Sequence, residues 1–170
     1  MGAVNAHGAS VVILGGGPGG YEAALVAAHL GADVTVVDRD GLGGAAVLTD
    51  CVPSKALIST ADFMSQFETA SDLGVHLEDN EGDEVADSVA ELAAVNRRVL
   101  ALASAQSRDI GARLSADGVR VVAGTGRLVS PGEVEASLAD GTTQTLQADV
   151  VLVATGATPR VMPTAEPDGE

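Results

Sequence analysis

The sequence predicts an α/β fold, in which helices cover a parallel sheet and a small antiparallel meander is attached to it. The apolar run at residues 11–14 leads through a glycine-rich turn into an alanine-rich segment of helical length. A second apolar run at residues 34–37 then supplies a parallel partner strand. Farther along the chain, short alternating segments are separated by Pro-Gly and Asp-Gly turns, which indicates the meander.

The first elements are predicted from the apolar runs and from the residues that begin and end helices. Proline suits a first helical turn because its missing N–H would have no partner there, and Gly31 is placed as a helix C-cap. After a flexible tail at residues 1–9, we expect a strand at Val11–Leu14, a helix at Pro18–Leu30, a strand at Val34–Asp38, a glycine-rich loop at Arg39–Asp50 and a helix from Cys51 to about Thr69.

The second half begins with an acidic connection and a long segment whose apolar residues recur at helical spacing. We expect the connection at Leu73–Asp87, the helix at Ser88–Leu114, strands at Val119–Val122, Gly126–Val129, Glu133–Leu138 and Thr143–Leu146, and a buried strand at Val150–Val153. The meander then covers about residues 125–147. One domain at residues 10–160 is expected, followed by a proline-rich tail at residues 161–170.

The glycine-rich turn has the spacing of a dinucleotide-binding, Rossmann-like fold. Gly15 allows the tight turn, Gly17 lets a pyrophosphate approach the bare backbone, and Gly20 lets the helix pack close to the strand. Pro18 opens the helix, whose free N–H groups and dipole favour an anion. Asp38 ends the second strand, where a carboxylate can accept the hydroxyls of an adenosine ribose. The alternative is an ordinary strand–helix–strand unit with a solvated aspartate.

The composition narrows the classes of partner. The 170 residues carry a formal net charge of −15, which disfavours nucleic acid and anionic membranes. The single cysteine excludes an intrachain disulfide, and no segment has the length and apolarity of a signal peptide or a membrane span. We therefore expect a cytoplasmic protein that does not insert into a membrane. We also expect no metal site.

Cys51 and Lys55 form a second candidate constellation. Cys51 opens a predicted helix, where the N-terminus can stabilise a thiolate, and Lys55 follows at i+4 on the same face. A buried cysteine beside a surface lysine is the simpler interpretation of this spacing.

Taken together, these motifs resemble the flavoprotein disulfide reductase family, which includes lipoamide dehydrogenase. The glycine triplet with Asp38 is similar to the family's FAD fingerprint, the segments Leu42–Gly44 and Cys51–Lys55 to its redox-active region, and Ala154–Gly156 to its second flavoprotein signature. The resemblance implies bound FAD, with Gly43, Gly44, Ala154, Thr155 and Gly156 along the cofactor, Thr125 and Gly126 beside the adenine, and Lys55 and Cys51 beside the flavin as catalytic residues.

The chain departs from the family pattern at one position. The family has a second cysteine five residues before the one that matches Cys51, and here that position is Ala46. Dithiol–disulfide exchange needs both sulfurs. The variant is similar to the actinobacterial NAD(P)H quinone reductases of this family, which implies that electrons pass from NAD(P)H through flavin to a small quinone-type acceptor.

Two alternatives remain open: a dihydrolipoyl dehydrogenase or disulfide reductase homologue, and a non-catalytic FAD-binding module. The resemblance also implies a homodimer and a chain more than twice as long. We therefore expect an N-terminal portion with an incomplete sheet, inactive when isolated.

Overall fold

The computed structural model describes residues 8–75, 89–158 and 160–166. The strands are β1 (Ser10–Leu14), β2 (Asp33–Asp38), β3 (Arg120–Ser130), β4 (Glu133–Leu138), β5 (Thr143–Gln147) and β6 (Val150–Val153). The helices are α1 (Pro18–His29), α2 (Gly44–Leu48), α3 (Cys51–Glu68), the short 3-10 helix η1 (Ala70–Leu73) and α4 (Leu92–Ala116).

The strands join into a six-stranded sheet in the order β5-β4-β3-β2-β1-β6. β1 pairs in parallel with β2 and β6, and β2 pairs in parallel with the start of β3. The second half of β3 pairs antiparallel with β4, and β4 with β5. This arrangement confirms the predicted α/β fold with a parallel sheet and an antiparallel meander.

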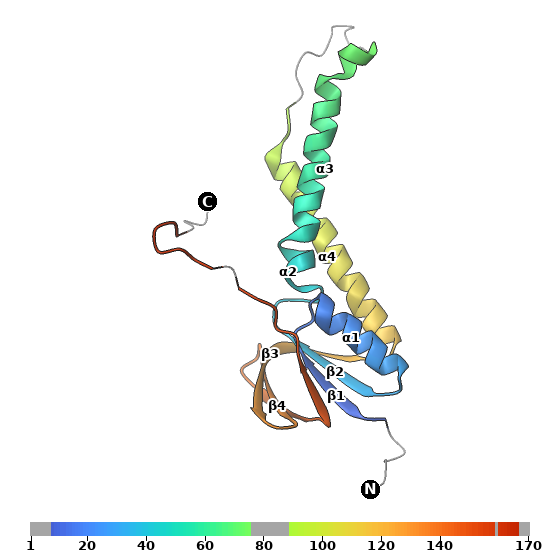
Figure 1. Cartoon of the computed structure of the whole chain (residues 1–170), viewed down its shortest axis with the longest axis vertical. Coiled ribbons are helices and arrows are strands. Elements are labelled where there is room, and N and C mark those ends of the chain that lie inside the picture. The colour runs from blue at the N-terminus through green and yellow to red at the C-terminus, as the bar shows by residue number, and fades with distance from the viewer. Residues whose placement is uncertain (1–7, 76–88, 159, 167–170) are drawn as a thin grey trace.

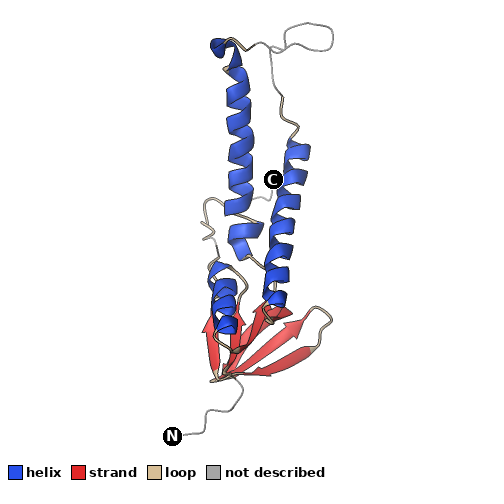
Figure 2. Ribbon diagram, turned by 90° about the vertical axis from the view of Figure 1, so that its right-hand side faces the viewer, coloured by secondary structure: helices blue, strands red, loops and turns tan. Residues whose placement is uncertain are grey.

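The two faces of the parallel strands pack against different partners, and the helices lie on one side of the sheet (Figure 2). On one face, Ile13 and Val36 pack with Ala24 and Leu25 of α1 and with Leu114 of α4. On the other face, Val12, Leu14 and Val37 pack against Val134, Ala136 and Leu146 of the meander. The alternation of side chains along β1 and β2 therefore feeds two separate apolar clusters.

α3 and α4 extend away from the sheet as a helical arm (Figure 1). The C-terminal end of α4 packs on the sheet through Leu114, whereas α3 buries only Ala56 among its own residues. The arm begins directly beside α2, so it projects from the same end of the molecule as the glycine-rich turn.

The structure corrects two predicted boundaries in the middle of the chain. The predicted loop Arg39–Asp50 contains α2, because the Gly43 N–H donates to the Gly16 carbonyl and holds the start of this short helix. The predicted strands Val119–Val122 and Gly126–Val129 form one strand, β3. Gly126 does not break that strand, because it pairs with Ala136 in the register of β3 with β4.

Several other expectations differ at the ends of elements. β6 was predicted to be buried, but it pairs only with β1 in the described sheet, and the Val153 side chain is 62% exposed. α4 begins at Leu92 rather than Ser88, and Ser88 lies outside the described residues. So do residues 1–7 of the predicted N-terminal tail, residues 76–87 of the acidic connection and residues 167–170 of the proline-rich tail.

Candidate functional site

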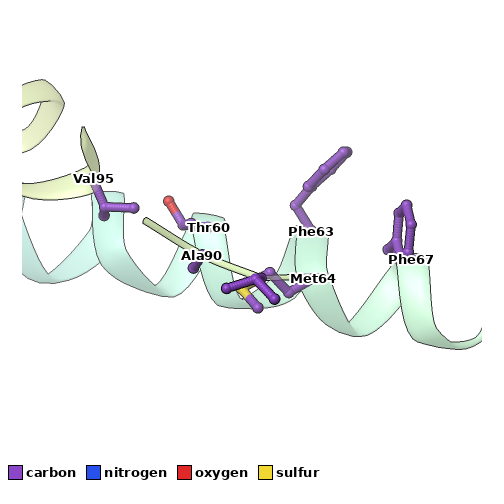
Figure 3. Close-up of a pocket in the computed structure, with 7 residues that line it drawn as sticks. Thr60, Phe63, Met64, Phe67, Ala90 and Val95 are labelled. Atoms are coloured by element: carbon purple, nitrogen blue, oxygen red, sulfur yellow. The ribbon is translucent and has the colours of Figure 1, made fainter. Parts of the chain in front are cut away.

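The helical arm carries an apolar groove of about 270 Å³ (Figure 3). Phe63 and Phe67 lie one turn apart on α3, and Thr60 is the one polar residue among those that line the groove. The remaining lining residues are Met64, Val89, Ala90 and Val95. A binding site for a charged or polar ligand needs convergent polar groups, which this groove lacks among its described residues.

A larger groove lies at the carboxyl ends of β1, β2 and β6, where ligands bind in open α/β sheets. It has a main part of about 620 Å³ and an adjoining part of about 360 Å³. Both parts are lined by Gly15, Asp38, Arg39, Asp40 and residues 155–158; the main part adds Gly17–Gly19, Gly44–Ala46, Leu48, Thr49 and Ala154, and the adjoining part Leu14, Val37 and Gly124–Gly126.

The glycine-rich turn forms one wall of this groove. Gly15 has φ of +102°, a backbone conformation that side chains disfavour, and Gly17 is the N-cap of α1. A Cβ on Gly17 would meet only the Gly44 Cα, at 3.9 Å. Within the described residues, neither the Gly17 nor the Gly19 N–H donates to a protein acceptor. The turn therefore presents bare, available amides at the positive end of α1.

The predicted signature after β6 lies beside this turn. The Ala154 N–H donates to the Leu14 carbonyl at 2.8 Å, which continues the pairing of β6 with β1. A Cβ on Gly15 would collide with the Ala154 carbonyl. The fold thus brings together two motifs that lie about 140 residues apart in the sequence.

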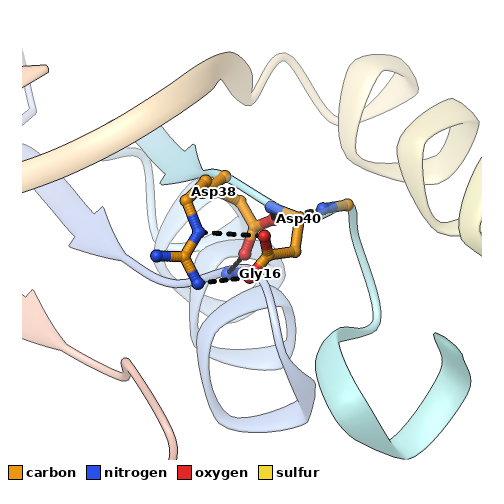
Figure 4. A network of polar contacts seen from close by, with 5 residues as sticks. Gly16, Asp38 and Asp40 are labelled. Atoms are coloured by element: carbon orange, nitrogen blue, oxygen red, sulfur yellow. Dashed lines mark hydrogen bonds and ion pairs between the residues drawn. The ribbon is translucent and has the colours of Figure 1, made fainter. Parts of the chain in front are cut away.

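Backbone amides from two segments of the chain donate to the Asp38 carboxylate (Figure 4). Its Oδ2 accepts the Gly16 N–H at 2.7 Å. Its Oδ1 accepts the N–H groups of Asp40 at 3.0 Å and Gly41 at 2.6 Å. The carboxylate therefore ties the glycine-rich turn to the loop that follows β2.

Arg39 and Asp40 form a bidentate ion pair next to Asp38. The Arg39 Nε donates to the Asp40 Oδ1 at 2.9 Å, and a terminal nitrogen donates to Oδ2 at 2.8 Å. These hydrogen bonds and the charge of Arg39 hold the pKa of the Asp40 carboxyl below its usual value. Arg39 is the one cationic side chain among the residues that line the two parts of the groove.

Not all of the predicted site residues line the groove. Gly15, Gly17, Pro18, Asp38, Gly44, Thr125, Gly126 and Ala154–Gly156 do so. Gly20 packs behind the turn against Gly15, and Gly43 holds α2 to Gly16. Cys51 at the start of α3 and Lys55 one turn later are both exposed and lie outside the lining of the groove, so their predicted catalytic roles stay predictions.

Sequence reasoning missed some residues that line the groove. Arg39 and Asp40 follow Asp38 directly, so their position after the second strand could have indicated them. Ala46 stands where the family has a second cysteine, and the structure places it in the lining of the main part. Thr49 also lines the main part, and no feature of the sequence pointed to it.

The described part of the chain was found to hold neither a metal-binding cluster nor a membrane-spanning helix. No group of three or more His, Cys, Asp and Glu residues there is arranged to hold a metal ion. No helix there combines the length and the hydropathy needed to cross a bilayer.

The solved structure of LpdA from Mycobacterium tuberculosis is similar to this chain, with a TM-score of 0.83 and 48% identity. The match covers 95% of this chain and 35% of LpdA. The NAD(P)H dehydrogenase (quinone) of M. tuberculosis is 50% identical over 94% of this chain, and the dihydrolipoyl dehydrogenase of Chlorobaculum tepidum is 35% identical over 94%.

The chain spans about one third of the length of these relatives, 33% of the quinone dehydrogenase and 32% of the dihydrolipoyl dehydrogenase. A family model described as pyridine nucleotide-disulphide oxidoreductase matches residues 9–169, which include all of the groove. The chain therefore belongs to the pyridine nucleotide-disulphide oxidoreductase family.

Proposed function

We propose that this chain is the FAD-binding part of an oxidoreductase that passes electrons from NAD(P)H through flavin to a quinone-type acceptor. The observation that carries the proposal is the long groove at the strand ends, with bare amides of the glycine-rich turn in one wall. Negative charge is favoured at a helix N-terminus, which suits the pyrophosphate of a dinucleotide.

The residues of the groove fit FAD in size and in chemistry. The space over Gly17 is open, so a phosphate can approach the backbone without meeting a side chain. Asp38 and Arg39 line the groove beyond the turn, where the adenosine of the dinucleotide would lie. The lining by Ala45, Ala46 and Leu48 is apolar and suits a ring system. FAD, when bound, supplies the acceptance of hydride and the onward transfer of electrons.

The presence of a single cysteine thiol in this chain supports a quinone rather than a disulfide as the electron acceptor. The chain has one cysteine, Cys51, and Ala46 stands in the groove where the family has a second. An exchange between a dithiol and a disulfide needs two thiols. The relative with 50% identity is named as a quinone dehydrogenase, which agrees with this choice.

A dihydrolipoyl dehydrogenase is the second candidate, because several relatives carry that name at about 35% identity. A non-catalytic FAD-binding module is the third. In all three cases Lys55 and Cys51 are the proposed flavin-side residues, on the α3 turn that follows Leu48 and Thr49 of the groove.

The first test is a titration of the purified chain with FAD, followed by flavin fluorescence. Gly17→Val adds a side chain over the turn at a backbone φ of −69°, which valine tolerates. We expect saturable binding by the native chain and at least a tenfold weaker affinity for Gly17→Val, because the added carbons occupy the space of the pyrophosphate. Thermal unfolding verifies that the variant is folded. Equal FAD affinity for the two proteins would contradict the dinucleotide site.

The second test concerns the acceptor and uses the complete gene product that carries this sequence. NADH and NADPH oxidation is measured with menadione and, separately, with lipoamide. Turnover with menadione alone supports the quinone reductase. Turnover with lipoamide would show that the interpretation of Ala46 is wrong, and FAD binding without turnover on either acceptor would favour the non-catalytic module.

A further inference from the structure

At the proposed adenosine end of the groove, Asp38 offers too few free hydrogen-bond acceptors for both hydroxyls of a ribose. The inference drawn from this rests on the proposed dinucleotide site. A carboxylate has about four lone-pair positions. Asp38 already uses three of them: Oδ1 accepts the Asp40 and Gly41 N–H groups, and Oδ2 accepts the Gly16 N–H. One position on Oδ2 remains, whereas the 2′ and 3′ hydroxyls of a ribose offer two donors.

Arg39 and Asp40 are placed to supply the missing partner. Both line the two parts of the groove together with Asp38. The Asp40 N–H reaches the Asp38 carboxylate at 3.0 Å, so the pair belongs to the same tight loop. Thr155 and Thr158 also line the groove, but no hydrogen bond of the described residues ties either to Asp38.

The ion pair keeps hydrogen-bonding capacity for a ligand. Each Asp40 oxygen accepts one bond from Arg39, which leaves one lone pair on each oxygen. The Arg39 and Asp40 side chains are 69% and 67% exposed, so both can be reached from the groove. Because the guanidinium lowers the pKa of Asp40, this carboxyl stays ionised at neutral pH and remains an acceptor.

We propose that Asp38 accepts only one of the two ribose hydroxyls and that the Arg39–Asp40 ion pair binds the other. Asp38 is then mainly a positioning residue, which joins the glycine-rich turn to the loop after β2. The specificity of the groove for an unmodified ribose is divided between Asp38 and the ion pair.

The experiment measures the dissociation constants of ADP, 2′-deoxy-ADP and 3′-deoxy-ADP by calorimetry, with the whole chain. The double variant Arg39→Ala/Asp40→Ala removes the ion pair but keeps all three backbone N–H groups that donate to Asp38. The matched control, Arg127→Ala with Glu135→Ala, removes an Arg–acid ion pair of 3.1 Å on the meander, which lines neither part of the groove.

The native chain and the control should bind each deoxy analogue about tenfold more weakly than ADP, because each analogue lacks a bond to a charged group. In the Arg39→Ala/Asp40→Ala variant, one deoxy analogue should bind as tightly as ADP, while the other should still bind about tenfold more weakly than ADP. A merely structural role of the pair would weaken all three ligands equally. If both deoxy analogues still bind more weakly than ADP in that variant, this inference is overturned but the proposed dinucleotide site is not. Failure of the native chain to bind ADP would overturn both.

Discussion

The contact between Gly20 and Gly15 decides how close α1 can lie to β1. A Cβ on Gly20 would overlap the Gly15 carbonyl oxygen, which belongs to the backbone and cannot rotate away. Gly20→Ala should therefore force α1 outward and lower the free energy of unfolding by about 3 kcal/mol, at the upper end for overpacked sites. Urea denaturation of the purified chain measures this change.

The neighbouring Gly19 provides a matched control for that substitution. A Cβ on Gly19 would meet nothing within 4 Å, and this residue lies in the same turn of α1. Gly19→Ala should leave the stability unchanged or raise it by up to about 1 kcal/mol, because alanine favours a helix. Equal losses in the two variants would show that close packing is not the reason for glycine at position 20.

At the level of single residues, the sequence was informative where one residue type is required. Gly15, Gly17 and Gly20 could be assigned from spacing alone, because a tight turn beside a helix N-terminus tolerates few other residues. The bonding of Asp38 could not be predicted, because it depends on amides of a loop whose conformation is set by the whole fold. The position of Ala46 in the groove likewise depends on α2, which the sequence did not predict.

At the level of elements, β6 is held to β1 by a side-chain network between Ser10, the first residue of β1, and Asp149, which directly precedes β6. The Asp149 carboxylate accepts the Ser10 N–H at 2.8 Å and the Ser10 hydroxyl at 2.9 Å. The Asp149 N–H in turn donates to the Ser10 hydroxyl oxygen at 2.9 Å. The hydrogen bonds that the carboxylate accepts lower the pKa of Asp149. The bond from the Ser10 backbone N–H has the largest effect, followed by the bond from the Ser10 hydroxyl.

This network gives a pH-dependent contribution to stability. Because the pKa of Asp149 is lower in the folded chain than in the unfolded one, its contribution is complete above the unfolded pKa of about 3.9 and is lost as the pH falls through the folded pKa. Asp149→Asn should therefore be less stable than the native chain at pH 7, and the difference should shrink below about pH 4. Chemical denaturation across this range measures it, and a difference that does not change with pH would contradict the role of the ionised carboxylate.

The elements that the sequence misplaced are those whose form depends on distant partners. β3 is one long strand because its first half pairs with β2 and its second half with β4, whereas the sequence predicted two separate strands. α2 has only five residues, too few for a periodic signal, and its start is held by Gly16. The predicted helix from Cys51 to about Thr69 agrees with α3, whereas the periodic segment predicted at Ser88–Leu114 differs from α4 at both ends.

At the level of the whole molecule, burial is unevenly divided between the sheet and the arm. Ile13, Val34 and Val36 are at most 1% exposed, whereas Phe63 and Leu92 of the arm are 69% and 67% exposed. The groove of the proposed cofactor is built mainly on the buried part, with α2 at its boundary to the arm. Stability therefore should not be uniform along the chain.

Amide hydrogen exchange should separate these two regions. Residues 60–68 in the outer half of α3 bury no side chain, so they should open locally and exchange faster than residues 12–14 and 34–37 of β1 and β2. Low urea should accelerate the sheet amides but barely change the outer α3 amides, because local opening exposes little new surface. Residues 99–103 of α4 serve as the internal control, since Val99 and Ala103 are buried and their helix should exchange more slowly than outer α3. Equal protection of outer α3 and of β1, with the same urea dependence, would show instead that the arm and the sheet unfold as one unit.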